Sequence, residues 1–390
     1  MPSVLLIARH YYPSPGAATN RLSAMVRVFR ERGWDVTVVT RQVATHASAA
    51  PESGPHGESI LRVRGDSSTG VGLRRASELI LFPLRALIRA KRLNTEFRLI
   101  IADPPPTVGL AALLLRSRGR RLVYYFADSW RELLAASGGR LGRLLAGPVG
   151  KLERGVLRRA DVVIAVTHGR AALAESAGGA AILSPNGVDG AVFTHDAPEV
   201  EPFRPPTGLP YLLYAGNFGE AHGSQIFAQA ASRTWATDSR NFALIFMGYG
   251  SNQAALEEYA REWPENFFII PPQTPEVAAS AYRQSCGGLA SVKPDDNLAH
   301  AVSVKALAAV MAGAPLIYVG AGPFVNDVVS GNMGLVASHS AEDVASHFRS
   351  LIQEPWSDRE RAKLSSAARR LYDNRQLAHT LVDNLMKLAE

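Results

Sequence analysis

Short apolar runs alternate with amphipathic stretches throughout the first half of the chain. Each run has the length and continuous apolar character of a strand buried on both faces of a parallel sheet. The runs lie at residues 4–8, 36–39, 99–102, 122–125 and 161–166. Between them lie segments of helical period, such as residues 21–32. This alternation predicts an α/β domain built on a doubly wound parallel sheet.

The second half repeats the same series of apolar runs and helical segments. Its predicted strands lie at residues 211–215, 242–246, 267–270, 288–292 and 316–319. Residues 196–210 separate the two halves and contain five prolines with few apolar side chains, which is typical of a linker. We therefore expect two Rossmann-like domains, at residues 1–195 and 211–372, with a C-terminal helical segment at 373–390.

Residues 303–317 stand out within the second half. Apolar side chains at helical spacing predict a short helix, with Ser303 as its N-cap and Gly313 at its end. Lys305 places a cation in the first turn, where it opposes the positive end of the helix dipole. An anion bound there would remove that conflict, because first-turn N–H groups and an ammonium group can share one phosphate. The alternative is a solvated surface lysine.

Polar residues and glycines gather where the predicted strands end, which is where open α/β sheets bind ligands. One such loop contains Gly16, although no GxGxxG dinucleotide motif is present. Asp128 follows the strand at 122–125 and is either an acid/base or hydroxyl-orienting group or the N-cap of the next helix. Asp295 and Asp296 form either a metal-binding pair or part of a solvated turn.

The composition is that of a globular protein without a membrane span. Hydrophobic residues make up 47% and charged residues 20% of the 390 positions. A single cysteine, Cys286, excludes an internal disulfide framework and a cysteine metal cluster. The N-terminus lacks the pattern of a signal peptide, and no uncharged apolar run reaches about 18 residues. These features predict a cytoplasmic protein.

Charge is unevenly distributed between the two halves. Residues 1–195 contain 27 Lys/Arg and 14 Asp/Glu, whereas residues 196–390 contain 15 and 21. Within the basic half, residues 73–93 mix aliphatic side chains with Arg85, Arg89, Lys91 and Arg92. This segment is either a cationic amphipathic helix on an anionic membrane or an ordinary surface helix. Nucleic acid fits poorly as a partner, because no aromatic residues are interleaved with the cations.

Several motifs, taken in order, resemble those of GT-B glycosyltransferases, in particular the retaining family-four group. They are YYPSPGAATNRL, DPPPTVG, YYFADSWREL, ERGVLRRADVVIAVT, SPNGVDGAVF, YAGNFGEAHG, FMGYGS and SVKALAAVMAGAPLI. Within the group, the sequence is most similar to bacterial exopolysaccharide or O-antigen amino-sugar transferases. The resemblance implies two Rossmann-like domains facing across a cleft, with the donor held by the second and the acceptor by the first. It also implies that the last helix returns to the first domain.

The same resemblance implies catalysis without a metal or other cofactor, on a nucleotide-sugar donor that is UDP-linked. The protein would then stabilise the developing diphosphate charge with N–H groups and cations. The acceptor would be a lipid-linked or small-molecule hydroxyl compound, and the enzyme would be cytoplasmic or peripheral on the inner face of the membrane.

Individual site residues follow from the resemblance. Lys305 matches the lysine of the family's helix-opening pattern, and Asp128 matches the acidic residue of an Asp-x-Trp stretch, so both are candidate catalytic residues. The candidate substrate-binding residues are Gly16, Ala17, Asn217, His222, Gly248, Tyr249, Pro272, Lys293, Ser303 and Ala308. Three positions depart from the family, which has a second glycine where this chain has Ala17 and glutamates where it has His300 and Ala308.

Three functions are consistent with these features. The first is a retaining sugar transferase whose basic domain docks on a membrane. The second is a related GT-B enzyme with an unusual donor or epimerase chemistry, which the absence of a glutamate at Ala308 favours. The third is a catalytically silent partner subunit, against which the presence of Lys305 and Asp128 argues.

Overall fold

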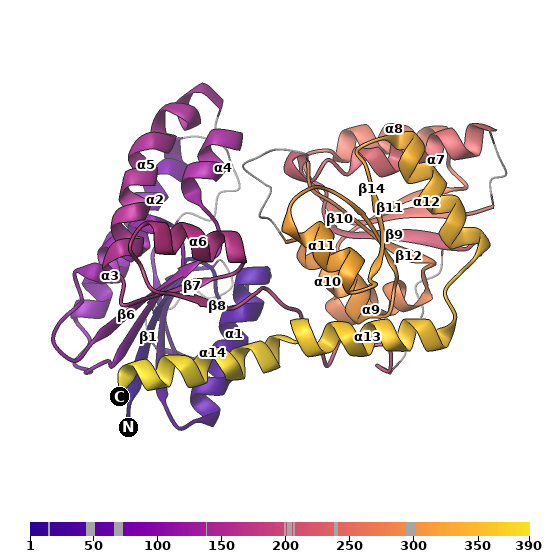
Figure 1. Cartoon of the computed structure of the whole chain (residues 1–390). Helices are drawn as coiled ribbons and strands as arrows, with labels where there is room; N and C mark the ends of the chain where they lie inside the picture. Colours follow the sequence, from indigo (N-terminus) through magenta and orange to yellow (C-terminus); the bar gives the residue numbers. More distant parts are fainter. Residues whose placement is uncertain are drawn as a thin grey trace. The chain divides into compact units, whose positions relative to one another are not determined.

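The computed structural model describes residues 1–14, 16–43, 51–65, 73–137, 139–198, 200, 205, 207–237, 241–293 and 302–390. Internal contacts divide the chain into two compact units (Figure 1). The first unit contains residues 1–186 and 374–390, and the second contains residues 187–373. Residues 187–195, which the sequence analysis assigned to the first domain, therefore group with the second unit.

The first unit is built on one eight-stranded sheet of order β3-β4-β2-β1-β5-β6-β7-β8. All neighbouring pairs are parallel except β3 with β4 at the edge. The strand order reverses between β1 and β5, so the topological switch point lies where the loops after these strands begin. The strands are β1 (Ser3–Ile7), β2 (Asp35–Arg41), β3 (Glu52–Ser53), β4 (Ser59–Val63), β5 (Leu99–Ala102), β6 (Arg121–Phe126), β7 (Val162–Ala165) and β8 (Ala181–Leu183).

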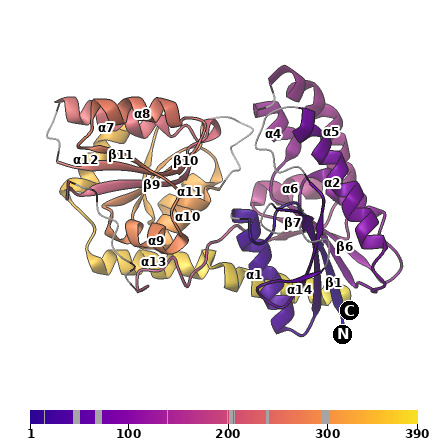
Figure 2. The ribbon, with the colours of Figure 1, turned by 180° about the vertical axis from the view of Figure 1, so that it is seen from behind.

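Helices cover both faces of this sheet, as Figures 1 and 2 show from opposite sides. One apolar core joins the sheet to α1 (Ala17–Glu31) and α14 (Asn374–Ala389). The core on the other face contains side chains from α2 (Leu73–Lys91), α3 (Pro106–Leu113), α5 (Gly139–Arg159) and α6 (His168–Ser176). The short helix α4 (Trp130–Ser137) packs on α5.

The second unit contains a six-stranded, fully parallel sheet of order β11-β10-β9-β12-β13-β14. Its switch point lies between β9 and β12. The strands are β9 (Tyr211–Asn217), β10 (Ala243–Tyr249), β11 (Phe267–Ile270), β12 (Gly287–Ser291), β13 (Leu316–Val319) and β14 (Gly334–Ala337).

Helices also cover both faces of the second sheet. On one face lie α9 (Pro275–Gln284), α10 (Val304–Met311), α11 (Pro323–Ser330) and α13 (Asp358–Tyr372). On the other lie α7 (Gln225–Thr237), α8 (Gln253–Glu262) and α12 (Ala341–Gln353). Both units are therefore doubly wound, Rossmann-like α/β domains, as the sequence predicted.

The C-terminal helical segment expected at residues 373–390 is the helix α14, which follows a separate helix, α13. Asp373 lies between α13 and α14 with φ −69° and ψ 116°, which is extended rather than helical. The helix α13 belongs to the second unit, whereas α14 packs on α1 in the first and pairs Asp383 with Arg32 at 2.8 Å. In the described ranges, no helix has the length and apolar content that crossing a membrane requires.

Candidate active site

Lys305 lies in the first turn of α10, and its ammonium group reaches the end of β9. Its Nζ donates hydrogen bonds to the Tyr214 hydroxyl at 2.9 Å and to the Asn217 carbonyl oxygen at 3.2 Å. No carboxylate in the described part of the chain pairs with it, and burial lowers the pKa of Lys305 to about 7. A cation held by neutral dipoles in this way is stabilised strongly by an anion placed beside it.

The strand ends beside Lys305 carry glycines. Gly216 and Gly248 are paired neighbours on β9 and β10, with φ angles of 136° and 146°. A Cβ atom at Gly216 would lie 3.1 Å from Cε of Lys305, and one at Gly248 would overlap the carbonyl oxygen of Gly216. Glycine at both positions therefore lets the backbone approach the lysine more closely than another residue would allow.

The loops after β9, β12 and β14 add further basic groups, His222, Lys293 and His339, to this edge of the sheet. Burial, and then the charge of Lys305, lower the pKa of His222 to about 4, so its imidazole is neutral at physiological pH. Lys293 forms an ion pair with Glu220 of the turn after β9 at 3.4 Å. Burial and the charge of Lys293 lower the pKa of His339, which follows β14. The sequence analysis assigned His222, Lys293 and Lys305 to the candidate site but missed His339.

Asn217 shapes the turn after β9 through its side chain. Its Oδ1 accepts a hydrogen bond from the Gly219 N–H at 2.6 Å, and its carbonyl oxygen also accepts one from the Tyr214 hydroxyl at 3.1 Å. Because Asn217 positions the carbonyl that holds Lys305, this residue acts in the site through its backbone as well as its side chain.

A pocket of about 630 Å³ opens where β10 and β11 end. It brings together Gly248, Tyr249 and Pro272, three residues that the sequence analysis assigned to substrate binding. Tyr249 is 62% exposed, and Arg261 also lines the pocket. An exposed aromatic ring, a proline and a guanidinium group offer both stacking and polar contacts to a flat heterocycle.

Ser303 and Ala308, both predicted to bind substrate, have different surroundings at the start of α10 and within it. Ser303 occupies the N-cap position, but its side chain forms no capping hydrogen bond. Ala308 is 7% exposed and packs in the core between α10 and the sheet. The position at which the resembled family has a glutamate is therefore occupied by a small apolar side chain.

In the first unit, Asp128 is exposed in the loop after β6. The helix cap that the sequence left open for Asp128 is made by Ser129, whose hydroxyl accepts the Glu132 N–H at 3.4 Å. Glu153 of α5 supports this turn, because its carboxylate accepts hydrogen bonds from the Ser129 hydroxyl at 2.9 Å and the Trp130 N–H at 2.7 Å. The turn is thus held in place without the Asp128 carboxylate.

A buried ion pair lies close to Asp128. Arg21 of α1 contacts Asp103, which follows β5, at 2.8 Å, and its guanidinium group lies 4.6 Å from the centre of the Tyr125 ring. Burial raises the pKa of Asp103, Arg21 opposes that rise, and the negative charge of Asp128 adds to it. The two carboxylates and the arginine therefore form one electrostatic cluster at this edge of the first sheet.

Gly16 and Ala17 lie where the loop after β1 enters α1. Gly16 is the N-cap with φ 140°, and Ala17 is the first helical residue. No side chain caps this helix, so glycine exposes the helix N-terminus at the same edge of the sheet as Asp128.

Some sequence predictions fall on residues outside the described ranges. They concern Asp295, Asp296 and His300, which lie within residues 294–301. Across the described ranges, no three His, Cys, Asp or Glu side chains come together in a way that could hold a metal ion.

Comparison with known proteins identifies the family. The model of Glycosyltransferase Family 4 matches residues 18–191, and that of Glycosyl transferases group 1 matches residues 209–354. The two matches fall on the first and second sheets. The chain is a GT-B glycosyltransferase of the family 4 type.

Several solved structures share the fold over almost the whole chain. Sucrose-phosphate synthase from Thermosynechococcus elongatus is 16% identical, with a TM-score of 0.78 over 100% of this chain and 99% of that one. HepE from Anabaena, solved with UDP, is 15% identical, with a TM-score of 0.70 over 99% and 100%. WaaG, a glycosyltransferase involved in lipopolysaccharide biosynthesis, is 17% identical, with a TM-score of 0.69 over 98% and 99%. Among curated proteins, no sequence match is found.

Proposed function

We propose that this glycosyltransferase uses a nucleoside-diphosphate sugar, whose diphosphate binds beside Lys305 at the carboxyl edge of the second sheet. The observation that carries the proposal is the partly buried ammonium group of Lys305, which in the described part of the chain contacts the hydroxyl and ring of Tyr214 and the carbonyl oxygen of Asn217. Glycine at the adjoining strand ends leaves the backbone accessible to a phosphate. Burial makes the electrostatic stabilisation of a diphosphate stronger there than at an exposed lysine.

The pocket between the ends of β10 and β11 is the proposed site of the nucleobase. Its exposed Tyr249 and Pro272 provide surfaces on which a base can stack. A uridine nucleotide is the favoured donor, because HepE, which shares the fold, has been solved with UDP and with UDP-glucose.

Transfer proceeds with retention in this proposal. The bond between the anomeric carbon and the diphosphate oxygen breaks, and the acceptor oxygen bonds to that carbon on the same face. The acceptor proton passes to the leaving diphosphate oxygen, and no metal takes part. Lys305 then stabilises the negative charge that develops on the diphosphate, and Asp128 orients the acceptor hydroxyl.

The acceptor in this proposal is a lipid-linked or other small-molecule hydroxyl compound. The enzyme works on the cytoplasmic side of an anionic membrane, in polysaccharide biosynthesis. Two features of the first unit support this assignment: the excess of basic residues and the aliphatic side chains exposed on α2.

Thermal shifts with a panel of nucleoside diphosphates and their sugars test the proposal. Selective stabilisation by uridine compounds is expected, because a ligand that binds only the folded state raises its stability. A sugar transfer assay with the stabilising donor follows. Absence of stabilisation by every nucleotide would contradict the proposal.

A second function, with an unusual donor or epimerase chemistry, is favoured by Ala308. Its small, buried side chain offers no carboxylate for ribose hydroxyls. If the donor is an ordinary nucleotide sugar, Ala308→Glu strengthens its binding; if the site has diverged, the substitution has no effect or only destabilises the core. A silent partner subunit would bind nucleotide or glycan without turnover.

A further inference from the structure

The outward face of α2 carries aliphatic side chains where a surface helix normally carries polar ones. Ile80, Leu84 and Ile88 recur every four residues along this face and are 67%, 50% and 44% exposed. Leu81, which is 37% exposed, lies beside them. The opposite side of the helix is buried in the core of the first unit.

The neighbouring helix α3 extends this apolar surface. The two helices are in contact, and α3 exposes Leu110 (44%) and, at its C-cap, Leu114 (63%). These two leucines are four residues apart and so lie on one side of the helix. A grouping of exposed aliphatic residues on adjacent helices marks an interaction site rather than scattered surface apolarity.

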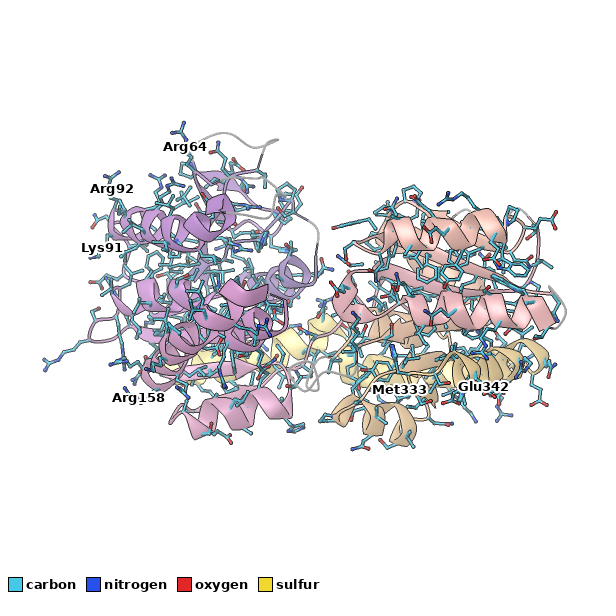
Figure 3. The ribbon with its side chains drawn as sticks, turned by 90° about the horizontal axis from the view of Figure 1, so that it is seen from above. Arg64, Lys91, Arg92, Arg158, Met333 and Glu342 are labelled. Atoms are coloured by element: carbon cyan, nitrogen blue, oxygen red, sulfur yellow. The ribbon has the colours of Figure 1, made fainter. Side chains whose placement is uncertain are left out.

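Cations flank the apolar surface, and carboxylates neutralise some of them: Arg85 pairs with Glu78, and Arg116 and Arg121 pair with Asp161. Residues 79–93 and 104–121 together contain eight Lys/Arg and no Asp or Glu. No described carboxylate pairs with Lys91, Arg92, Arg118 or Arg120, and Lys91 and Arg120 line a common pocket of about 270 Å³. Lys91 and Arg92 point outward from the first unit (Figure 3).

We infer that the face formed by α2, α3 and the loop at residues 115–120, here called the α2–α3 face, docks on a lipid leaflet with anionic headgroups. The aliphatic side chains enter the boundary between headgroups and acyl chains, and the flanking cations bind lipid phosphates. A second copy of the chain fits less well, because it would bring like charges together. This inference specifies the membrane partner of the proposed function, but vesicle binding can be measured without turnover.

Flotation with vesicles tests the inference, using phosphatidylcholine with or without phosphatidylglycerol. Binding is expected only when phosphatidylglycerol is present and should weaken with salt. Two variants should each reduce binding more than tenfold. The aliphatic variant, Ile80→Gln/Leu84→Gln/Ile88→Gln, removes the exposed aliphatic side chains of α2. The cation variant, Lys91→Gln/Arg92→Gln/Arg118→Gln/Arg120→Gln, removes four flanking cations. The matched control, Arg233→Gln/Arg359→Gln/Lys363→Gln/Arg370→Gln, makes the same charge change on exposed positions of the second unit.

Insertion is measured separately with an environment-sensitive dye. Cys286 is the only cysteine, so Cys286→Ser provides a background in which Leu84→Cys is labelled, with Arg233→Cys as the control position. A blue shift at position 84 alone, on anionic vesicles, is expected. Each variant's nucleotide binding is also measured, so that loss of docking is distinguished from loss of the donor site.

Three results would overturn the inference. If the wild-type protein does not bind anionic vesicles, the α2–α3 face is not a membrane-docking surface. If the control variant loses as much binding as the Lys91/Arg92/Arg118/Arg120 variant, net charge alone attracts the protein to the vesicles. If the wild-type protein is a dimer that does not bind vesicles, and the Ile80/Leu84/Ile88 variant dissociates it, the face binds a second copy of the chain.

Discussion

The ammonium nitrogen of Lys305 lies 2.9 Å from the hydroxyl oxygen of Tyr214, a residue 91 positions earlier in the chain. The Tyr214 hydroxyl donates its own hydrogen bond to the Asn217 carbonyl oxygen, which also accepts one from Lys305. The cation is therefore fixed at the end of β9 by neutral partners. This arrangement is what makes the second unit a candidate diphosphate site.

Nucleotide binding should depend on pH through Lys305. Its pKa of about 7 means that the free protein loses the charged form above pH 7. A bound diphosphate favours the charged form, so binding takes up a proton, and affinity should fall by up to about tenfold per pH unit above 7. Calorimetry in buffers of different ionisation enthalpy measures both effects. Lys305→Arg, which stays charged, should show no such fall, and a flat wild-type profile would contradict the prediction.

Replacing Gly216 should weaken nucleotide binding. Gly216→Ala places a Cβ 3.1 Å from Cε of Lys305 and forces alanine into a conformation with φ 136°, so we expect a loss of about 1–3 kcal/mol in stability and displacement of the ammonium group. Gly33→Ala is the control, because that glycine also has a positive φ but its Cβ would meet nothing within 4 Å. Thermal shifts measure the stability of both variants, and calorimetry measures their nucleotide affinity. Equal nucleotide affinity in the two variants would contradict this prediction.

Glu153 should position the Asp128 loop. Glu153→Leu removes both hydrogen bonds to Ser129 and Trp130 and should lower stability by about 2–4 kcal/mol and reduce kcat. Glu153→Gln can still accept from the Trp130 N–H and donate to Ser129, so it should retain most of both properties. Urea denaturation and turnover rates test the pair. A Gln variant as impaired as the Leu variant would mean that negative charge, rather than hydrogen bonding, is required.

The ion pair between Arg21 and Asp103 should be sensitive to loss of one partner. Asp103→Asn leaves a buried guanidinium group without its counter-ion, which typically costs about 3–5 kcal/mol. The double variant Arg21→Met/Asp103→Leu removes both charges and should recover much of that loss. Urea midpoints of the three proteins provide the measurement. A double variant no more stable than Asp103→Asn would show that the pair contributes more than mutual neutralisation.

The strand and helix pattern could be predicted because apolar periodicity directly reflects burial in a parallel sheet. The sequence analysis placed a boundary between residues 372 and 373, but it could not predict the extended conformation of Asp373, because the sequence there, Tyr-Asp-Asn-Arg, contains neither Gly nor Pro. That conformation depends on tertiary contacts. Val188 donates a hydrogen bond to the Tyr372 carbonyl at 3.0 Å and bridges to Asp373. Such long-range pairing leaves no local signal.

The candidate site could be predicted only in part for the same reason. Lys305 and Asp128 were identifiable from their positions at a helix start and a strand end. Asp103 carried the same strand-end signal and was missed, and Glu153 carried none, because its partners are 23 and 24 residues away. The partners of Lys305 lie on the strand β9, about 90 residues earlier in the chain, so its partial burial and lowered pKa could come only from the structure.

Calorimetric titration of a uridine diphosphate into wild-type protein and Lys305→Met is the most direct test of the donor site. Methionine keeps most of the side-chain volume and removes the charge. Lys363→Met, at an exposed position of the same unit, controls for loss of a positive charge elsewhere. We predict that Lys305→Met weakens binding by about 100-fold or more, while Lys363→Met binds as wild type does. Undiminished binding to Lys305→Met would contradict the assignment of the diphosphate to Lys305.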